Sequence, residues 1–256
     1  MPLNSWQVVT TTHRGSKSEN DDFALAEIHR ARRGRYATLC VCDGVGSFPG
    51  SGKCAQAVGH AMTTILSKAL FRRKRSSLDA FQLRNQVATE LRRHIPKKSP
   101  SDATTPLATT LAAGIVDRNS LLTIWAGDSR IYLLNEEGQL LLATKDHQDE
   151  QGRLSRWVQG DGQIAGRLEA NSLRFSSRPV AVCATTDGVH EHCQREELRQ
   201  FLLYCVLSGV SDSQKLQNDL QAFLNVNVCD NYSLSLWTTQ AGRRRLASRG
   251  RRLLNP

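Results

Sequence analysis

The stretch "ATLCVCDGVGSFPGSGKCAQAV" (residues 37–58) changes character at Asp43-Gly44. The apolar run before the aspartate predicts a buried strand, and a helical pattern begins after a loop that is rich in glycine. Asp-Gly is a common hairpin turn, but a hairpin needs a second strand directly after the turn, and none follows here. The sequence therefore predicts a strand-to-helix connection with a carboxylate at the tip of the strand.

Strand and helix patterns follow one another along the rest of the chain. The spacing of apolar residues predicts strands at 5–12, 21–28, 36–43, 109–117, 121–128, 130–135, 139–144, 179–187 and 232–239. It predicts helices at 53–71, 78–95, 192–207 and 213–224, while residues 147–172 show no assignable pattern. Because there is no internal repeat and no obvious linker, we expect one α+β domain over residues 1–240. The basic segment 241–256 has little to bury, and we expect a disordered tail there.

Composition limits the cellular setting and the class of partner. The chain begins without a recognisable targeting segment and its apolar runs are too short to span a bilayer, so we expect a cytoplasmic protein without a membrane partner. Its seven cysteines form no CxxC pair, which argues against a zinc knuckle and favours reduced thiols. The net charge of +10 comes largely from basic runs without Trp or Tyr, so we expect solvated helix faces and no specific nucleic-acid site. Attraction to acidic or phosphorylated partners is the weaker alternative.

Further carboxylates lie where predicted strands meet loops, as Asp43 does. They are Asp21, Asp22, Asp128, Asp187 and Asp230. Any single aspartate in such a place is more often a cap for a helix or a turn. The recurrence of the pattern favours a second interpretation, in which the carboxylates converge on a hard cation.

Ligand chemistry then selects the metal. Oxygen-only ligands suit Mg²⁺ or Mn²⁺, and the histidines show no HExxH spacing. A glycine after the aspartate lets the backbone bend so that its carbonyl can also reach an ion. Several carboxylates that hold two ions can activate a bridging water and neutralise a phosphoryl group. The residues therefore indicate two-metal phosphoester hydrolysis, whereas no GxxxxGK[ST] loop supports a nucleotide site.

Seven short segments occur in an order that is typical of one family. They are "KSENDD" (17–22), "DGVGS" (43–47), "TTLAAGIV" (109–116), "GDSR" (127–130), "TKDH" (144–147), "TTDGV" (185–189) and "DNYSLSLW" (230–237). With this order and spacing the chain resembles the metal-dependent Ser/Thr protein phosphatases of the PP2C (PPM) family, in a bacterial-type, single-domain form. Each motif alone is weak, but the ordered set extends over roughly residues 6–239.

The resemblance implies a fold and a set of metal ligands. The fold is a β-sandwich of two antiparallel sheets that helices flank on both sides. Asp43 would bridge two catalytic ions of Mg²⁺ or Mn²⁺, and Asp187 and Asp230 would complete the shell of the first ion. The carbonyl of Gly44 would serve the second ion, and Asp22 would contact that ion directly or through a water.

Further residues take supporting parts in the same resemblance. Asp128 would hold a third, weaker ion together with Asp187. Lys17 stands where the family has an arginine that grips the substrate phosphate. Asp21 and Asn231 would support the ligands without contacting the ions.

Four positions depart from the family pattern. Lys17 replaces an arginine, so a two-pronged grip on phosphate becomes a point charge. Asp21 replaces a glutamate, and Ser47 replaces the second glycine of its motif. Val45 stands where some eukaryotic members carry a histidine. None of these changes removes a predicted metal ligand.

The leading hypothesis is therefore an active Mg²⁺/Mn²⁺-dependent phosphatase that removes phosphate from serine and threonine in proteins. The resemblance implies phosphorylated protein substrates and an opposing Ser/Thr kinase, and we expect a monomer. The alternative is a pseudophosphatase, a regulatory module that binds phosphoproteins, which the departures at Lys17, Asp21 and Ser47 motivate. A basic nucleic-acid-binding protein is a third hypothesis that rests on the charge alone.

Overall fold

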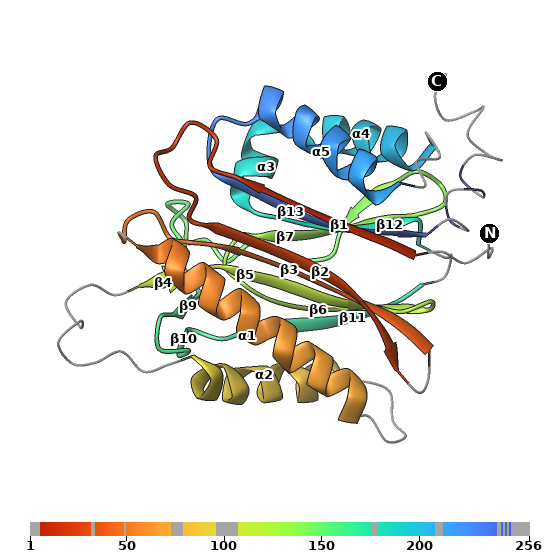
Figure 1. The fold of residues 1–256 in the computed structure, drawn as a ribbon. Coiled ribbons are helices and arrows are strands. Elements are labelled where there is room, and N and C mark those ends of the chain that lie inside the picture. The colour runs from red at the N-terminus through yellow and green to blue at the C-terminus, as the bar shows by residue number, and fades with distance from the viewer. Residues whose placement is uncertain are drawn as a thin grey trace.

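Two five-stranded sheets lie face to face at the centre of the molecule, and helices cover both outer faces (Figure 1). The computed structural model describes residues 6–31, 34–48, 50–72, 79–95, 107–175, 179–207 and 212–239, together with Gly242, Arg244 and Leu246. All pairings between its strands are antiparallel. The predicted α+β sandwich of two antiparallel sheets between helices is confirmed.

Three sheets account for the strands. The first has the order β11-β6-β5-β3-β2, and its strands are β2 (Asp22–Ala31), β3 (Gly34–Asp43), β5 (Leu111–Val116), β6 (Ser120–Ala126) and β11 (Glu169–Arg174). The second has the order β1-β13-β12-β7-β8, and its strands are β1 (Trp6–His13), β7 (Arg130–Leu134), β8 (Leu140–Leu142), β12 (Ala181–Thr185) and β13 (Tyr232–Thr239). A small sheet of order β10-β9-β4 contains β4 (Ala108–Thr109), β9 (Trp157–Gln159) and β10 (Ile164–Ala165).

Five helices form the two outer layers of the described chain. The helices α1 (Ser51–Arg72) and α2 (Ala80–His94) pack on the first sheet, and α3 (Asp187–His192), α4 (Arg195–Leu207) and α5 (Ser213–Asn227) pack on the second. Two aspartates begin helices as caps: the Asp79 carboxylate accepts from the backbone N–H groups of Phe81 and Gln82, and Asp212 caps α5 in the same way. Such caps satisfy N–H groups that a helix start leaves without partners.

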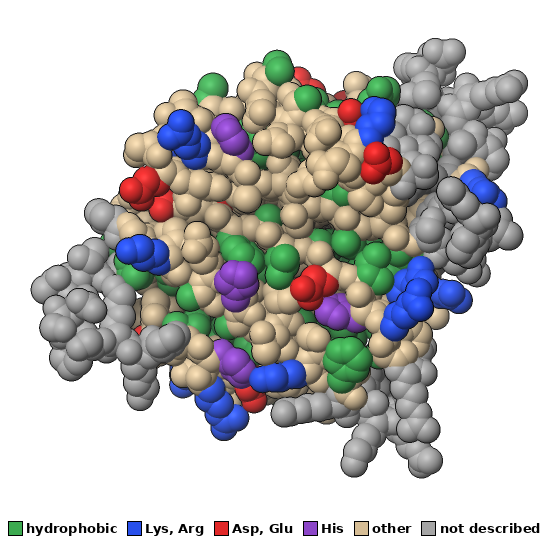
Figure 2. Space-filling view, in the orientation of Figure 1, with side chains coloured by type: hydrophobic (Ala, Val, Ile, Leu, Met, Phe, Trp, Pro, Cys, Tyr) green, Lys and Arg blue, Asp and Glu red, His purple; other side chains and the backbone are tan. Residues whose placement is uncertain are grey.

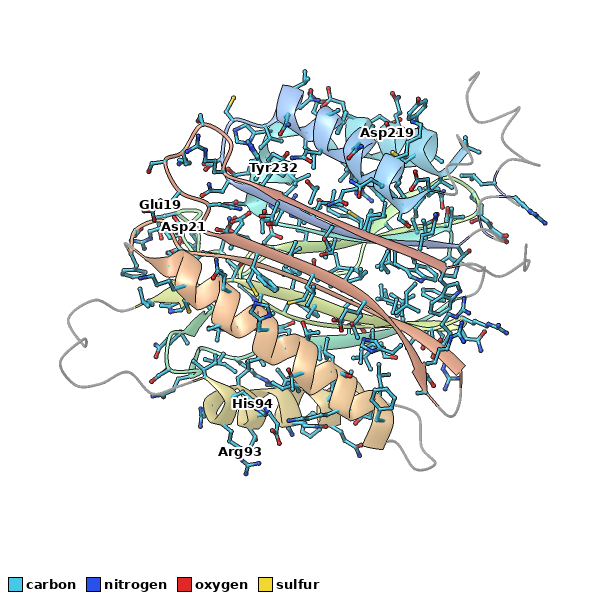
Figure 3. The ribbon with its side chains drawn as sticks, in the orientation of Figure 1. Glu19, Asp21, Arg93, His94, Asp219 and Tyr232 are labelled. Carbon is cyan, nitrogen blue, oxygen red and sulfur yellow. The ribbon has the colours of Figure 1, made fainter. Side chains whose placement is uncertain are left out.

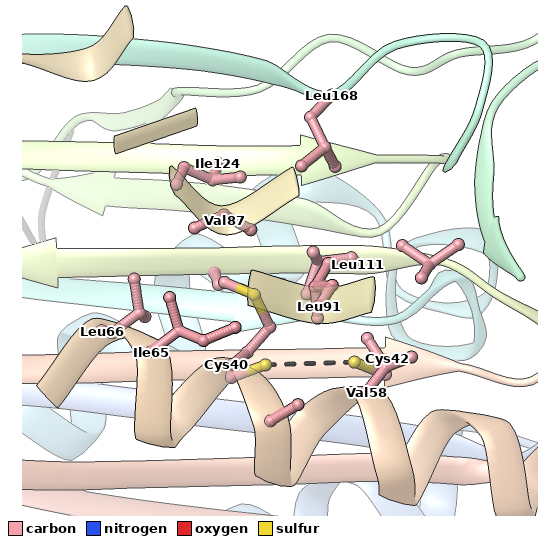
Figure 4. Close-up of a cluster of buried hydrophobic side chains, with 14 of the residues drawn as sticks. Cys40, Cys42, Val58, Ile65, Leu66, Val87, Leu91, Leu111, Ile124 and Leu168 are labelled. Atoms are coloured by element: carbon pink, nitrogen blue, oxygen red, sulfur yellow. Dashed lines mark hydrogen bonds between the residues drawn. The ribbon is translucent and has the colours of Figure 1, made fainter. Parts of the chain in front are cut away.

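Strand β3 is buried on both of its faces. Leu39 and Val41 point into the apolar layer between the two sheets. Cys40 and Cys42 point the other way, toward α1, with 3.9 Å between their sulfur atoms (Figure 4). Because side chains alternate along a strand, burial of both faces requires the continuous apolar run that precedes Asp43. This packing on both faces fixes the position of β3, and with it the position of the Asp43 carboxylate at the end of the strand.

The structure assigns elements where the sequence pattern did not. The unassigned residues 147–172 contain β9, β10 and most of β11. Strands of two or three residues, such as β9 and β10, are too short to show alternation, and the six residues of β11, "EANSLR", are mostly polar. Asp187, expected at the end of a strand, instead begins α3. A helix of six residues makes fewer than two turns, so it leaves no helical spacing of apolar residues for sequence analysis to detect.

Charged side chains of both signs are interspersed on the face that Figure 2 shows. On that face the described Lys and Arg side chains form no single continuous patch. Within the described ranges, no helix combines the length and the apolar character that crossing a membrane requires.

The segment that was expected to be a tail contributes to the core. Leu246 is fully buried and belongs to the same apolar cluster as Val180 and Leu236. The backbone N–H of Gly242 donates to the side chain of Thr239, 2.8 Å away. The expectation that residues 241–256 have little to bury is therefore wrong at Leu246. The other residues of the segment, apart from Gly242 and Arg244, lie outside the described part of the chain, so the tail there stays a prediction.

The buried position of Leu246 gives a testable prediction. Leu246→Ala should lower the free energy of unfolding by about 2–4 kcal/mol, because it removes buried methyl groups and leaves a cavity. Urea denaturation followed by circular dichroism measures this loss. Arg244→Ala, at an exposed position two residues earlier, is the matched control and should change little. Equal midpoints for both variants would show that Leu246 does not pack as described.

Candidate active site

The predicted acidic residues gather at one end of the sandwich, where strand tips and helix starts meet. The pairing of β2 with β3 places Asp22 directly opposite Asp43. Burial raises the pKa of the Asp43 carboxyl well above its usual range, and the charges of Asp22, Asp187 and Asp128 raise it further. Asp230 adds in the same way to the raised pKa of Asp22. Residues that are far apart in the sequence therefore form one cluster of negative charge.

Two threonines hold the backbone of Asp43. The Asp43 N–H donates to the Thr110 hydroxyl (3.0 Å), and the Thr110 N–H donates to the Asp43 carbonyl (2.8 Å). The Thr109 hydroxyl donates to the same carbonyl at 2.8 Å. Thr110 is itself held by a hydrogen bond to the Ser129 hydroxyl, 2.7 Å away. The paired threonines of the sequence motif thus fix the end of β3 and aim its carboxylate.

Gly44 is required because α1 begins directly against it. A Cβ at this position would lie 2.7 Å from the Ser51 carbonyl carbon and 2.8 Å from the Asp21 carbonyl oxygen, which is closer than real contacts allow. The Gly44 N–H donates to that Asp21 carbonyl at 3.0 Å. The glycine therefore provides space for a close approach, whereas the sequence interpretation attributed it to backbone bending.

Asp21 supports the site from behind, at the start of α1. Its side-chain oxygen accepts a hydrogen bond from the backbone N–H of Gly52, 3.0 Å away. Asp21 and Glu19 lie on the segment that leads into β2, at the end of the molecule where α1 begins (Figure 3). The contact joins the first motif to the start of α1, and the supporting part of Asp21 at the metal ligands stays a prediction.

Asp22 is buried and held on one side only. Its Oδ2 accepts a hydrogen bond from the Thr186 hydroxyl at 2.7 Å, and that hydroxyl accepts one from the Ser233 N–H at 2.8 Å. Its Oδ1 is buried without a hydrogen-bond partner among the described residues. Burial raises the pKa of Asp22 to about 7; the bond from Thr186 opposes the rise and Asp187 adds to it. A buried oxygen of this kind is costly unless a proton or a cation meets it.

Asp128 has the same one-sided arrangement. The side-chain amide of Gln148 donates to its Oδ2 at 3.1 Å, while its Oδ1 is buried and accepts no hydrogen bond within the described chain. Burial raises the pKa of Asp128 to about 6, and Asp187 contributes to the rise. Arg130, its nearest cation in sequence, instead forms a two-pronged ion pair with Asp146, with Nη2 and Oδ2 2.6 Å apart. Asp128 is thus left without a cation from its own motif.

Lys17, Asp230 and Asn231 meet at the rim of the site. The Lys17 ammonium lies 3.2 Å from Oδ1 of Asp230. The Asn231 side-chain amide donates to the backbone carbonyls of Arg14 (3.0 Å) and Glu19 (2.8 Å). Asn231 therefore ties the loop that carries Lys17 to the start of β13, and its supporting part at the metal ligands stays a prediction.

Sequence reasoning missed two residues of this site. Thr186 was visible only as the hydroxyl residue before Asp187 in its motif, and Gln148 follows the "TKDH" segment without any pattern that marks it. Both donate a hydrogen bond to a predicted metal ligand from another part of the chain. Such contacts depend on folding, so spacing along the sequence does not reveal them.

The donor set fits a hard cation in charge and in ligand type. Five carboxylates act on one another, and two of their buried oxygens, on Asp22 and Asp128, accept no hydrogen bond from the described residues. Oxygen ligands of this kind suit Mg²⁺ or Mn²⁺. As the described side chains stand, no three acidic, histidine or cysteine residues are grouped closely enough to hold an ion by themselves. Mg²⁺ usually keeps several of its waters, so one or two direct carboxylates are sufficient.

The contact between Thr186 and Asp22 can be tested directly. Thr186→Val keeps the shape of the side chain but removes the hydroxyl that holds Asp22, so Mn²⁺ affinity should fall by about 10–100-fold. Thr186→Ser restores the hydroxyl and should retain most of the affinity. Isothermal titration of Mn²⁺ into both variants measures the difference. Equal affinities would show that the hydrogen bond does not orient Asp22.

Comparison with known proteins places this fold and site in a family. The chain belongs to the protein phosphatase 2C family, whose model matches residues 9–225. It is 30% identical over 138 residues to a Mycoplasma pneumoniae protein named "Putative protein phosphatase". That match covers 51% of each protein, so the chain spans about half the length of the curated relatives that it matches.

Solved structures of bacterial phosphatases have the same fold. The Ser/Thr phosphatase Stp1 of Staphylococcus aureus superposes with a TM-score of 0.70 at 17% identity, over 93% of this chain and 97% of that one. The catalytic domain of the Ser/Thr protein phosphatase PstP, solved in complex with two manganese ions, superposes with a TM-score of 0.60 at 16% identity, over 91% and 98%. At these identities the likeness shows the fold.

Proposed function

We propose that this protein phosphatase 2C family member hydrolyses phosphoserine and phosphothreonine in proteins, with Mg²⁺ or Mn²⁺ as its cofactor. The observation that carries the proposal is the acidic cluster, in which buried oxygens of Asp22 and Asp128 accept no hydrogen bond from the described residues. A cation would satisfy both oxygens and offset the repulsion among the carboxylates. The two manganese ions bound by the PstP catalytic domain support the same choice of metal.

In this proposal one set of residues would hold the ions and another would hold the substrate. The groups that would hold the ions are Asp22, Asp43, the Gly44 carbonyl, Asp128, Asp187 and Asp230. When bound, such ions lower the pKa of a water and offset the charge of the phosphoryl group. Thr186 and Gln148 each fix one oxygen of a ligand and leave the other oxygen free. Lys17, at the rim, supplies a positive charge for the substrate phosphate.

A phosphoprotein-binding pseudophosphatase is the second candidate. The observation that favours it is that the described side chains form no ready-made group of three metal ligands. The departures from the family pattern at Lys17, Asp21 and Ser47 point the same way. We favour the enzyme because every aspartate predicted as a ligand is present and because the ion pairs of the described residues bring one exposed cation, Lys17, against the five clustered carboxylates.

One assay separates the two candidates. Hydrolysis of p-nitrophenyl phosphate and of a phosphothreonine peptide is measured with Mn²⁺, with Mg²⁺ and with EDTA. If the protein is an enzyme, both substrates should be turned over with a divalent ion, and EDTA should abolish that turnover. Absence of metal-dependent turnover, together with binding of the intact phosphopeptide, would favour the pseudophosphatase.

Partners and cellular setting are part of the same proposal. The substrates are phosphorylated proteins, and the opposing enzyme is a Ser/Thr kinase. We propose that the protein acts in the cytoplasm, as the composition of the chain suggests, and that it is a monomer.

A further inference from the structure

Lys17 is the positively charged side chain that lies beside the acidic cluster of Asp22, Asp43, Asp128, Asp187 and Asp230. Among the ion pairs of the described residues, Lys17–Asp230 is the one that reaches any of the five clustered aspartates. The side chains are 55% and 44% exposed, respectively, so either one can change partner without leaving water. An exposed pair of this kind is weak, and a competing charge can break it.

The position of Lys17 is built into the fold. The loop between β1 and β2 is fixed to the start of β13 by the Ser16 N–H and hydroxyl, which donate to the Cys229 carbonyl at 2.9 and 2.7 Å. Gly15, with a φ of +57°, packs so tightly that a Cβ there would lie 2.1 Å from the Asp230 carbonyl oxygen. Asn231 holds both ends of the same loop. Lys17 is thus kept within reach of Asp230 by contacts between segments more than two hundred residues apart.

We propose that Lys17 is shared between Asp230 and the substrate phosphate, and that the divalent ion decides which of them it contacts. Without the ion, Lys17 neutralises Asp230. When an ion takes over that carboxylate, Lys17 is released and turns to the phosphate. The proposal rests on the proposed metal-dependent function and adds to it a coupling between metal binding and phosphate binding.

The chemistry of the lysine side chain gives this exchange its physical basis. An ammonium is a compact charge on a flexible stem, and it is easily redirected from one oxygen to another. A guanidinium fork has five donors and could contact Asp230 and a phosphate together. Lysine therefore makes phosphate binding depend on the metal, and linkage requires that phosphate in turn strengthens metal binding.

The first experiment measures competition for Asp230. Mn²⁺ is titrated calorimetrically into the full-length protein, into Lys17→Met and into Arg14→Met. Lys17→Met should bind Mn²⁺ on the order of two- to fivefold more tightly, the scale of one exposed ion pair. Arg14→Met removes the same charge from the same loop, where the guanidinium donates to the Ser18 carbonyl, and should have a smaller effect. Equal changes in both variants would overturn the proposal, because they would reflect net charge alone.

The second experiment measures the coupling itself. Inorganic phosphate is titrated into the same proteins and into Lys17→Arg, with and without saturating Mn²⁺. The parent protein should gain more phosphate affinity from Mn²⁺ than either Lys17 variant does: methionine cannot contact phosphate, and arginine should already bind it without the ion. Equal gains in all three would overturn the proposal. If the parent binds no Mn²⁺ at all, the proposed metal-dependent function fails as well, so the two failures are distinguishable.

Discussion

Asp43→Asn is expected to reduce turnover of a phosphothreonine peptide by more than about a hundredfold, even at saturating Mn²⁺. Removing a group that only orients a metal ligand already lowers metal affinity or activity by about 10–100-fold, and Asp43 is itself a predicted ligand. The asparagine keeps the size of the side chain and its place opposite Asp22 but loses the negative charge that a hard cation needs. Asp187→Asn should have a similar effect. Steady-state kinetics on one phosphopeptide measure the loss.

The same variant should fold at least as well as the parent when metal is absent. Burial and the charges of Asp22 and Asp187 disfavour the ionised Asp43 carboxylate, so a neutral amide removes the free-energy cost of that buried charge in the folded state. Urea denaturation in EDTA tests this. Asp219→Asn, which alters an exposed ion pair on α5, is the control and should leave turnover unchanged. Near-normal turnover of Asp43→Asn at saturating Mn²⁺ would refute its assignment as a metal ligand.

Divalent metal should strongly stabilise the protein against heat. An ion that binds only the folded state adds about 2.7 kcal/mol at a hundred times its Kd. For a chain of this size that corresponds to a rise in Tm of about 5–10 °C. Scanning calorimetry with Mn²⁺ and with EDTA measures the rise, and Asp187→Asn should lose most of it. A Tm that is independent of Mn²⁺ in the parent protein would contradict metal binding at the acidic cluster.

The sequence predicted the elements whose signal is local. The apolar run before Asp43 and the helical spacing after Gly52 are continuous patterns, so the bounds of β3 and α1 follow from them closely. The short α3 and the small sheet were missed because a few residues carry no periodicity. The family resemblance, which depends on the order of the motifs, added the sandwich that local patterns could not specify.

The candidate site divides in a similar way. The aspartates could be named from the sequence because each occupies the same kind of place, at the junction of a strand and a loop. The residues that orient them could not, since Thr186 reaches Asp22 across 164 positions and Gln148 reaches Asp128 from another loop. The ion pair of Lys17 with Asp230 was equally hidden, because the sequence suggested a phosphate as the partner of Lys17.

The order of the second sheet has a consequence for the newly made chain. Strand β13 lies between β1, the first strand, and β12, so a central place in the sheet is filled after all the other strands have been synthesised. Until then β1 and β12 each present an unpaired edge, which favours association with other chains and creates a need for chaperones. The hydrogen bond that holds Asp22 is also incomplete until then, because its donor Thr186 is itself held by the Ser233 N–H of β13. A chain that stops short of Tyr232 is therefore expected to aggregate and to lack an ordered acidic cluster, so the candidate site is complete only in polypeptides whose translation has passed β13.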